Sequence, residues 1–145
     1  MRLYLDTSAL VKLYVEEEGS PLVRKAVEEA ETVATSIVGY VEARAAFARR
    51  HRAKTISLLD YRRVIRDFES DWGRYLILQV TDVLIRQAGR LTEAHKLRAY
   101  DAIHLASATI LRQRLADAVS FASWDSQLQT AARREGLDLV HIRES

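Results

Sequence analysis

The 145-residue sequence has no cysteine and a single proline, Pro21. The missing cysteines exclude disulfide bonds and thiolate metal sites, and they are typical of proteins from a reducing compartment. No uncharged run approaches the roughly 18 residues that a membrane-spanning helix needs. Asp6 and Lys12 interrupt the apolar amino terminus, so no signal peptide is expected. We therefore expect a cytoplasmic protein with no membrane partner.

Motifs of several common enzyme classes are also missing. The chain has no P-loop, no G-x-G-x-x-G turn and no G-x-S-x-G nucleophile elbow. Its four histidines form no metal-ligand spacing such as H-x₃-H. The sequence therefore gives no support to nucleotide-dependent chemistry, to a serine hydrolase or to a histidine-based zinc site.

What the chain does contain is typical of one globular domain. Hydrophobic residues make up 48% of it and charged residues 29%, with a formal net charge of +2. Of the 22 basic residues, 18 are arginine, which suits bidentate recognition of phosphate better than lysine does. Arginine-rich helix surfaces or a genomic composition bias explain the same count. The charge alone therefore favours a nucleic-acid partner only weakly.

Five short apolar segments suit buried strands, and helical patterns separate them. The segments are RLYL (2–5), TVAT (32–35), YLILQV (75–80), AVSFAS (118–123) and LDLVHI (137–142). Strands that alternate with helices predict an α/β fold, here a single domain over residues 1–145. We expect a parallel sheet of about five strands with helices on both faces.

Capping residues predict where three of the helices begin or end. Ser20 before Pro21 is typical of an N-cap followed by proline in the first turn. The stretch SLLD (57–60) predicts a capping box that opens a helix ending near Gly73. Gly136 predicts the end of a helix that begins after Asp125.

Asp6 and Asp125 each follow a predicted strand. Ligands of open parallel sheets bind beyond the carboxyl ends of the strands, so both acids are candidates for a site. Each is also a good N-cap for the helix after it. The two roles are compatible, because a capping aspartate can still direct one oxygen at a metal ion.

Glu42 lies in the helical stretch SIVGYVEARAAFARR (36–50). At 100° per residue this stretch predicts an apolar stripe with Glu42 at its edge, formed by Ile37, Val38, Val41, Ala45 and Ala48. A solvated boundary glutamate is the alternative to a functional one. Arg44 projects near the middle of the stripe, where it can snorkel, pair with an acid or face a partner protein.

Asp101 lies near the start of YDAIHLASATILRQRL (100–115), a helix that is apolar nearly all round and is therefore expected to be buried. A carboxylate there must be paired, hydrogen-bonded or metal-bound, unless it caps the helix. His104 follows one turn later. A buried histidine that is hydrogen-bonded locally is the expectation for it, over a catalytic role.

Four stretches of the chain occur in the order seen in PIN-domain proteins, and together they most resemble the VapC toxins of bacterial and archaeal toxin–antitoxin pairs. The stretches are LYLDTSALVKLY, SIVGYVEARAAFAR, LRAYDAIHLASA and FASWDSQLQTAARREGL. The resemblance covers essentially the whole chain. It implies an acidic cluster with supporting hydroxyl groups; the acids are Asp6, Glu42, Asp101 and Asp125, and the hydroxyl residues are Thr7, Ser8 and Ser123. Trp124 is bulkier than expected at its position.

The resemblance implies a metal-dependent endoribonuclease that leaves a 5′-phosphate and a 3′-hydroxyl. Ligands that are all oxygen favour Mg²⁺ or Mn²⁺, with one or two ions. Asp6 and Asp101 are the expected principal ligands. The implied partners are the RNA substrate, a small antitoxin and a second copy of the chain in a homodimer. Residues 20–30 and 36–73 are the expected antitoxin contacts.

Three other functions are alternatives to the ribonuclease. A haloacid-dehalogenase-like phosphatase needs a second aspartate two residues after Asp6, where this chain has Ser8. A non-catalytic RNA- or protein-binding module predicts a gap in the acidic set, and the sequence shows none. A structure-specific DNA nuclease predicts an inserted domain or helical arch, for which the chain offers no segment.

Overall fold

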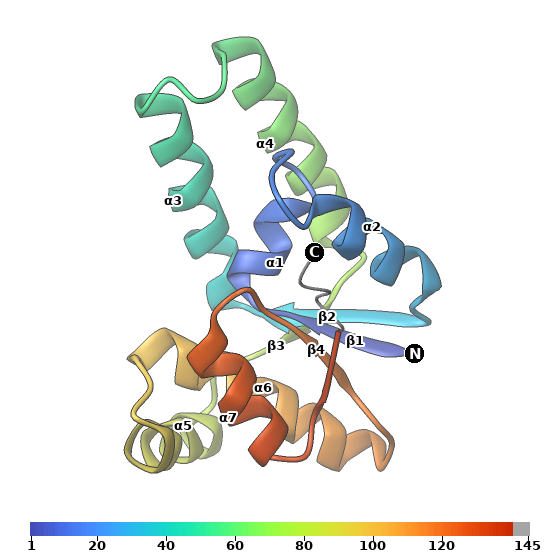
Figure 1. The fold of residues 1–145 in the computed structure, drawn as a ribbon, viewed down its shortest axis with the longest axis vertical. Helices are drawn as coiled ribbons and strands as arrows, with labels where there is room; N and C mark the ends of the chain where they lie inside the picture. Colours follow the sequence, from blue (N-terminus) through green and yellow to red (C-terminus); the bar gives the residue numbers. More distant parts are fainter. Residues whose placement is uncertain (141–145) are drawn as a thin grey trace.

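Residues 2–5 form a strand whose side chains alternate between two apolar layers. Tyr4 packs into one layer, and Leu3 and Leu5 pack into the other. All three are fully buried, as expected for a strand that is covered on both faces. In the computed structural model, which describes residues 1–140, this strand lies at the centre of the sheet (Figure 1).

The five predicted strands form one sheet, and every neighbouring pair is parallel. The strands are β1 (Arg2–Leu5), β2 (Thr32–Ser36), β3 (Leu76–Leu78), β4 (Ser120–Ala122) and β5 (Asp138–Leu139), in the spatial order β3-β2-β1-β4-β5. The predicted α/β fold is confirmed. The last three strands are shorter than predicted, and residues 141 and 142 of the LDLVHI segment lie outside the described residues.

Helices cover both faces of the sheet (Figure 1). One layer contains α1 (Thr7–Lys12), α2 (Ser20–Glu29), α3 (Val38–Arg52) and α4 (Leu58–Trp72). The other contains α5 (Asp82–His95), α6 (Ala99–Leu115) and α7 (Ser126–Arg134). None of these helices is long and apolar enough to cross a membrane.

Most of the predicted helix ends are confirmed. The Ser57 hydroxyl accepts a hydrogen bond from the Asp60 amide at 3.1 Å, and α4 ends at Gly73. Gly136 follows α7 with φ of 86°. The prediction for Ser20 was wrong, because Gly19 is the N-cap and Ser20 is the first helical residue. The Ser20 hydroxyl instead donates to the Val15 carbonyl at 3.1 Å.

The predicted apolar stripe of α3 was also wrong. The buried face consists of Gly39, Ala43, Ala46 and Phe47, whereas Val41 is 60% exposed. Small residues let α3 approach its neighbours closely, and hydrophobic periodicity gives such residues little weight. Arg44 lies outside this face and pairs with Glu69 of α4 at 2.8 Å, one of the roles that the sequence left open.

Candidate active site

From β1 the sheet extends through β2 to β3 on one side and through β4 to β5 on the other. This reversal leaves a crevice at the carboxyl ends of β1 and β4. The chain leaves β1 for α1 on one face and leaves β4 for α7 on the other. The Asp6 amide donates to the Ala122 carbonyl at 3.1 Å and so holds the two strand ends together. Open parallel sheets bind ligands at such a switch point.

A pocket of about 290 Å³ lies in this crevice, and all four predicted acids line it. We call it the carboxylate pocket; its lining residues are Asp6, Thr7, Ser8, Glu42, Arg98, Asp101, His104, Trp124 and Asp125. The acids come from four separate segments: the β1–α1 junction, α3, α6 and the start of α7. The structure thus brings the four acids together, while their catalytic role stays a prediction.

Asp6 is held rigidly at the start of α1. It is 4% exposed, and its Oδ1 accepts hydrogen bonds from the Ala9 amide at 3.0 Å and the Ser8 hydroxyl at 2.7 Å. Burial raises the pKa of the Asp6 carboxyl, and the positive potential of His104 and nearby hydroxyl groups offset part of this rise. Asp6 is therefore both a helix cap and a buried acid of the pocket.

Ser8 joins the two strand ends that carry Asp6 and Asp125. Its hydroxyl donates to Asp6 and accepts from the Trp124 amide at 3.0 Å. Ser123, the other predicted supporting hydroxyl of this region, accepts from the Asp125 amide at 3.1 Å. Both serines thus fix the backbone around the acids.

Glu42 is fixed by Thr7 and His104. Its Oε1 accepts from the Thr7 hydroxyl at 2.7 Å and lies 2.8 Å from Nε2 of His104. Burial alone would raise the pKa of Glu42, but the hydrogen bonds from His104 and Thr7 outweigh it and lower the pKa below its usual value. Glu42 is therefore ionised at neutral pH.

His104 is 2% exposed and hydrogen-bonded on both ring nitrogens. The expectation of a buried histidine is confirmed, but the expectation that its hydrogen bonds are local was wrong. Its partners are remote in sequence, since Nδ1 lies 2.8 Å from the Tyr4 hydroxyl of β1. No local pattern in the sequence indicated Tyr4 or the link to Glu42.

Asp101 and Asp125 share one arginine. Nε of Arg98 donates to Oδ2 of Asp101 at 3.2 Å, and Nη2 of Arg98 lies 3.6 Å from Oδ2 of Asp125. Arg98, not Asp101, is the N-cap residue of α6, so the capping alternative for Asp101 is wrong. Asp125 does cap α7, because its Oδ1 accepts from the Leu128 amide at 2.8 Å. The only indication of Arg98 in the sequence is its position three residues before Asp101, a spacing that allows an ion pair on a helix.

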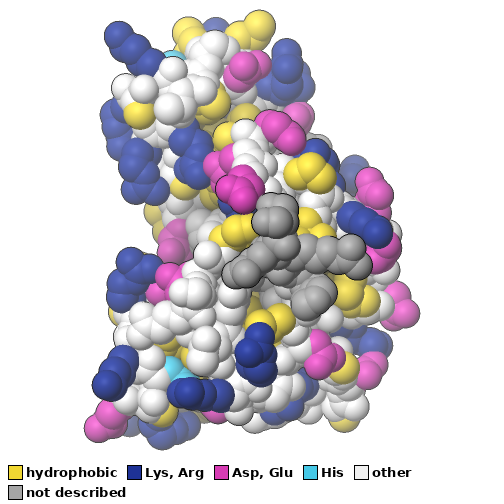
Figure 2. Space-filling view, viewed as in Figure 1, with side chains coloured by type: hydrophobic (Ala, Val, Ile, Leu, Met, Phe, Trp, Pro, Cys, Tyr) yellow, Lys and Arg dark blue, Asp and Glu magenta, His cyan; other side chains and the backbone are white. Residues whose placement is uncertain are grey.

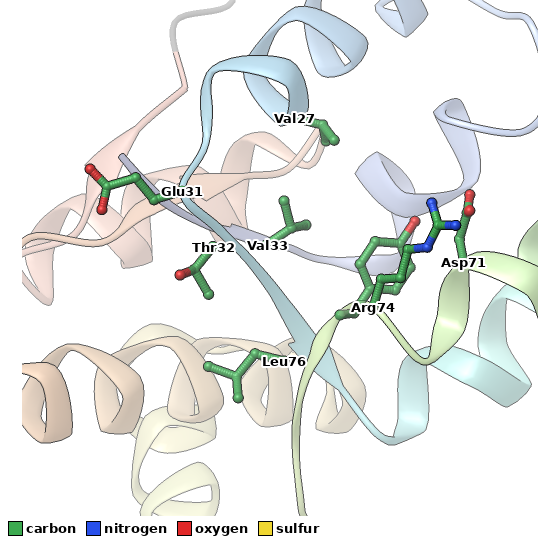
Figure 3. Close-up of a pocket in the computed structure, with 8 residues that line it drawn as sticks. Val27, Glu31, Thr32, Val33, Asp71, Arg74 and Leu76 are labelled. Carbon is green, nitrogen blue, oxygen red and sulfur yellow. The ribbon is translucent and has the colours of Figure 1, made fainter.

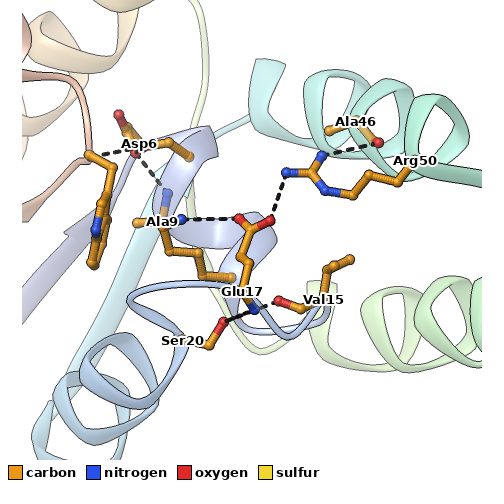
Figure 4. A network of polar contacts seen from close by, with 10 residues as sticks. Asp6, Ala9, Val15, Glu17, Ser20, Ala46 and Arg50 are labelled. Atoms are coloured by element: carbon orange, nitrogen blue, oxygen red, sulfur yellow. Dashed lines mark hydrogen bonds and ion pairs between the residues drawn. The ribbon is translucent and has the colours of Figure 1, made fainter. Parts of the chain in front are cut away.

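A second network supports the pocket from behind α1 (Figure 4). Nζ of Lys12 donates to Glu17 at 3.1 Å, and Arg50 of α3 donates to the other Glu17 oxygen at 3.0 Å. The Lys12 ammonium also lies 5.0 Å from the centre of the Trp124 ring. These contacts tie α1, and with it Asp6, to α3 and to the β4–α7 loop.

A larger hollow lies elsewhere, at the amino ends of β2 and β3 (Figure 3). It has a volume of about 660 Å³, and its acids are Glu31 and Asp71. Asp71 already accepts a hydrogen bond from the Tyr14 hydroxyl at 2.9 Å. We place the candidate site in the smaller carboxylate pocket, because four acids meet there at the end of the sheet that binds ligands.

Each acid of the carboxylate pocket already has a protein partner. Among residues 1–140, no three histidine, aspartate or glutamate side chains converge closely enough to hold a metal ion in this arrangement. The chemistry of the donor set still fits a hard divalent cation, since the donors are carboxylate oxygens. The capping bonds use only Oδ1 of Asp6 and of Asp125, so their second oxygens are not needed for capping.

Comparison with known proteins gives consistent results. The PIN domain family model matches residues 3–133. Ribonuclease VapC45 of Mycobacterium tuberculosis (strain CDC 1551 / Oshkosh) is 34% identical over 134 residues, which cover 92% of this chain and 91% of the relative. The fold resembles PAE2754 from Pyrobaculum aerophilum, with a TM-score of 0.67, 18% identity and coverage of 97% and 84%. It also resembles a chain of a toxin–antitoxin complex from Klebsiella pneumoniae, with a TM-score of 0.61, 18% identity and coverage of 87% and 88%.

Proposed function

Because this chain belongs to the PIN-domain family, we propose that it is a metal-dependent endoribonuclease and the toxin of a VapBC-like toxin–antitoxin pair. The observation that carries the proposal is the meeting of four acids from four segments in one pocket at the switch point of the sheet. A relative that covers nine-tenths of the chain and is named a ribonuclease supports RNA as the substrate.

The acids of the pocket are expected to hold Mg²⁺ or Mn²⁺. Two carboxylates about 5 Å apart repel by roughly 3 kcal/mol at an effective dielectric constant of about 20. A divalent cation removes this repulsion, and oxygen ligands without histidine or cysteine favour Mg²⁺ or Mn²⁺ over Zn²⁺. We assign Asp6 and Asp101 as principal ligands, directly or through water, with Glu42 and Asp125 completing the pocket around the ion.

The bound ion would lower the pKa of a water molecule and stabilise the negative charge that develops on the phosphate and the leaving oxygen. Glu42 is the side chain that we assign to orient the attacking water and accept its proton. Its Oε1 is occupied by Thr7 and His104, so the accepting atom is Oε2. The lowered pKa keeps this carboxylate ionised and ready to accept a proton. If the 3′ oxygen leaves and takes up a proton from solvent, the products are a 5′-phosphate and a 3′-hydroxyl.

The partners that we propose are a small antitoxin and a second copy of the chain, in the cytoplasm. The resemblance to a chain of a toxin–antitoxin complex supports the antitoxin. Residues 20–30 and 36–73, which include α2, α3 and α4, are the proposed contact surface. Apolar side chains available for such contacts include Val41 and Leu59, which are 60% and 69% exposed.

Cleavage of total cellular RNA tests the proposed function. Wild type with Mg²⁺ or Mn²⁺ is compared with Asp6→Asn, with a chelator control and mapping of the cut ends. Asp67→Asn serves as the matched control, because Asp67 is an exposed acid of α4 that is paired with Arg66 and does not line the pocket. We expect metal-dependent cleavage by wild type and Asp67→Asn and none by Asp6→Asn. Cleavage that resists the chelator would contradict the proposal.

A further inference from the structure

Arg98 is the only lysine or arginine among the side chains that line the carboxylate pocket. It lines the pocket together with four acids and pairs with two of them, which come from separate segments of the chain. Its guanidinium lies 3.2 Å from Asp101 at the start of α6 and 3.6 Å from Asp125 at the start of α7. A single positive charge thus spans the mouth of the proposed metal site.

This contact is easily broken. The Arg98 side chain is 81% exposed, and ion pairs at such exposure contribute little to stability. Arg98 is also the N-cap of α6, with an extended backbone (φ of −69°, ψ of 157°), and its side chain makes no capping bond. Leaving the two acids therefore costs Arg98 neither helix structure nor buried surface.

We propose that Arg98 is a positioning residue for RNA, which neutralises Asp101 and Asp125 when no metal ion is bound and binds a phosphate of the RNA strand once a divalent cation occupies these acids. This inference rests on the proposed function. A cation bound at Asp101 or Asp125 neutralises their negative charge and repels the guanidinium. The nearest anion left for Arg98 is then the incoming strand, and the guanidinium fork matches two phosphate oxygens.

The surroundings of the pocket suit a strand held by its phosphates. In the space-filling view, Lys and Arg side chains lie above and below a hollow on the left edge, where α3 rises from the sheet (Figure 2). Acidic side chains appear within the hollow itself. A backbone that follows this edge passes from basic side chains to acidic ones.

Titration calorimetry with Mn²⁺ tests the first half of the proposal without any RNA. Arg98→Gln removes the competing charge, so we expect it to bind Mn²⁺ about two- to five-fold more tightly than wild type. Arg86→Gln is the matched control, because Arg86 makes an exposed ion pair with Asp82 at 2.9 Å on α5, away from the pocket. We expect this control to bind Mn²⁺ as wild type does.

The salt dependence of RNA binding tests the second half. A short single-stranded RNA of mixed sequence is titrated at saturating Mn²⁺ into Glu42→Gln protein, which keeps the three aspartates but lacks the proposed proton acceptor. Adding Arg98→Gln should weaken binding about tenfold and reduce the slope of log affinity against log salt by about 0.7, the value for one phosphate contact on a single strand. Arg98→Lys should restore the slope, and Arg86→Gln should leave it unchanged.

The outcomes separate this inference from the function on which it rests. Equal or weaker Mn²⁺ binding by Arg98→Gln overturns the inference alone, and so does an unchanged salt slope. A wild-type protein that takes up no Mn²⁺ and cuts no RNA overturns the proposed function as well. Tighter Mn²⁺ binding together with a reduced slope supports both halves.

Discussion

Nε2 of His104 lies 2.8 Å from Oε1 of Glu42, and the two residues are 62 positions apart in the chain. On the other side of the ring, Nδ1 lies 2.8 Å from the Tyr4 hydroxyl. Burial raises the pKa of the Tyr4 phenol, so the phenol keeps its proton at neutral pH. The ionised Glu42 carboxylate can only accept a hydrogen bond, so Nε2 of His104 carries the hydrogen that points to it. A strand residue of the core thus sets the orientation of an acid in the pocket.

Tyr4→Phe should weaken both the fold and the site. It leaves Nδ1 of the buried His104 without its partner, which costs about 1–3 kcal/mol of unfolding free energy. Cleavage should fall as well, because Glu42 is then less firmly held. Chemical denaturation and RNA cleavage measure the two effects. Tyr61→Phe is the control, since no hydrogen bond of its hydroxyl is found in the described part of the chain; equal stability of the two variants would contradict the role of Tyr4.

Asp6→Asn should stabilise the metal-free protein at neutral pH. The folded-state pKa of Asp6 is raised by burial, so ionised Asp6 destabilises the fold increasingly as pH rises from the ordinary aspartate value of about 3.9 through the raised one. Asparagine removes this charge and still caps α1. Thermal unfolding with a chelator should therefore show a higher Tm for Asp6→Asn at pH 7, and a smaller difference at pH 4. A lower Tm of Asp6→Asn than of wild type at both pH values would show that ionised Asp6 does not destabilise the fold.

With Mn²⁺ bound, wild type should have a higher Tm than Asp6→Asn. A cation that binds the folded pocket stabilises wild type by mass action, by about 2.7 kcal/mol at one hundred times its dissociation constant. Asp6→Asn lacks one of the proposed principal ligands and should gain much less. The measurement is the Tm at millimolar Mn²⁺ against the Tm with chelator. An equal gain in both proteins would place the bound Mn²⁺ away from Asp6.

Gly19→Ala should destabilise the region around Trp124. Gly19 has φ of 91°, and an added Cβ would lie 2.5 Å from the Trp124 ring. Both the strained backbone and the steric clash oppose the substitution, and together they cost about 1–3 kcal/mol. Gly73→Ala is the control, because φ there is −69° and nothing lies within 4 Å of the new Cβ. Denaturation midpoints compare the two, and equal midpoints would contradict the packing of Trp124 on Gly19.

The sequence predicted the elements that depend on local patterns. Continuous apolar runs indicated the strands, and the caps Asp6, Ser57 and Asp125 marked helix starts correctly. The buried face of α3 could not be predicted, because it rests on the small residues Gly39, Ala43 and Ala46 and depends on which neighbours approach closely.

The candidate site was predicted as a set of residues but not as an arrangement. A parallel sheet places residues after its strands at one edge, which is why Asp6 and Asp125 could be paired in advance. Contacts between distant segments, such as Tyr4 with His104 or Arg98 with Asp125, have no local signature. They depend on strand order and helix packing, which one sequence does not reveal.

Locating bound Mn²⁺ by its anomalous scattering in crystals of the wild-type protein tests the central claim most directly. If the four carboxylates form the metal site of a nuclease, an anomalous peak lies within the carboxylate pocket, bounded by Asp6 and Asp101, and Arg98 has moved away from Asp125. A peak at the other acids of the surface, or no peak at saturating Mn²⁺, would contradict that claim.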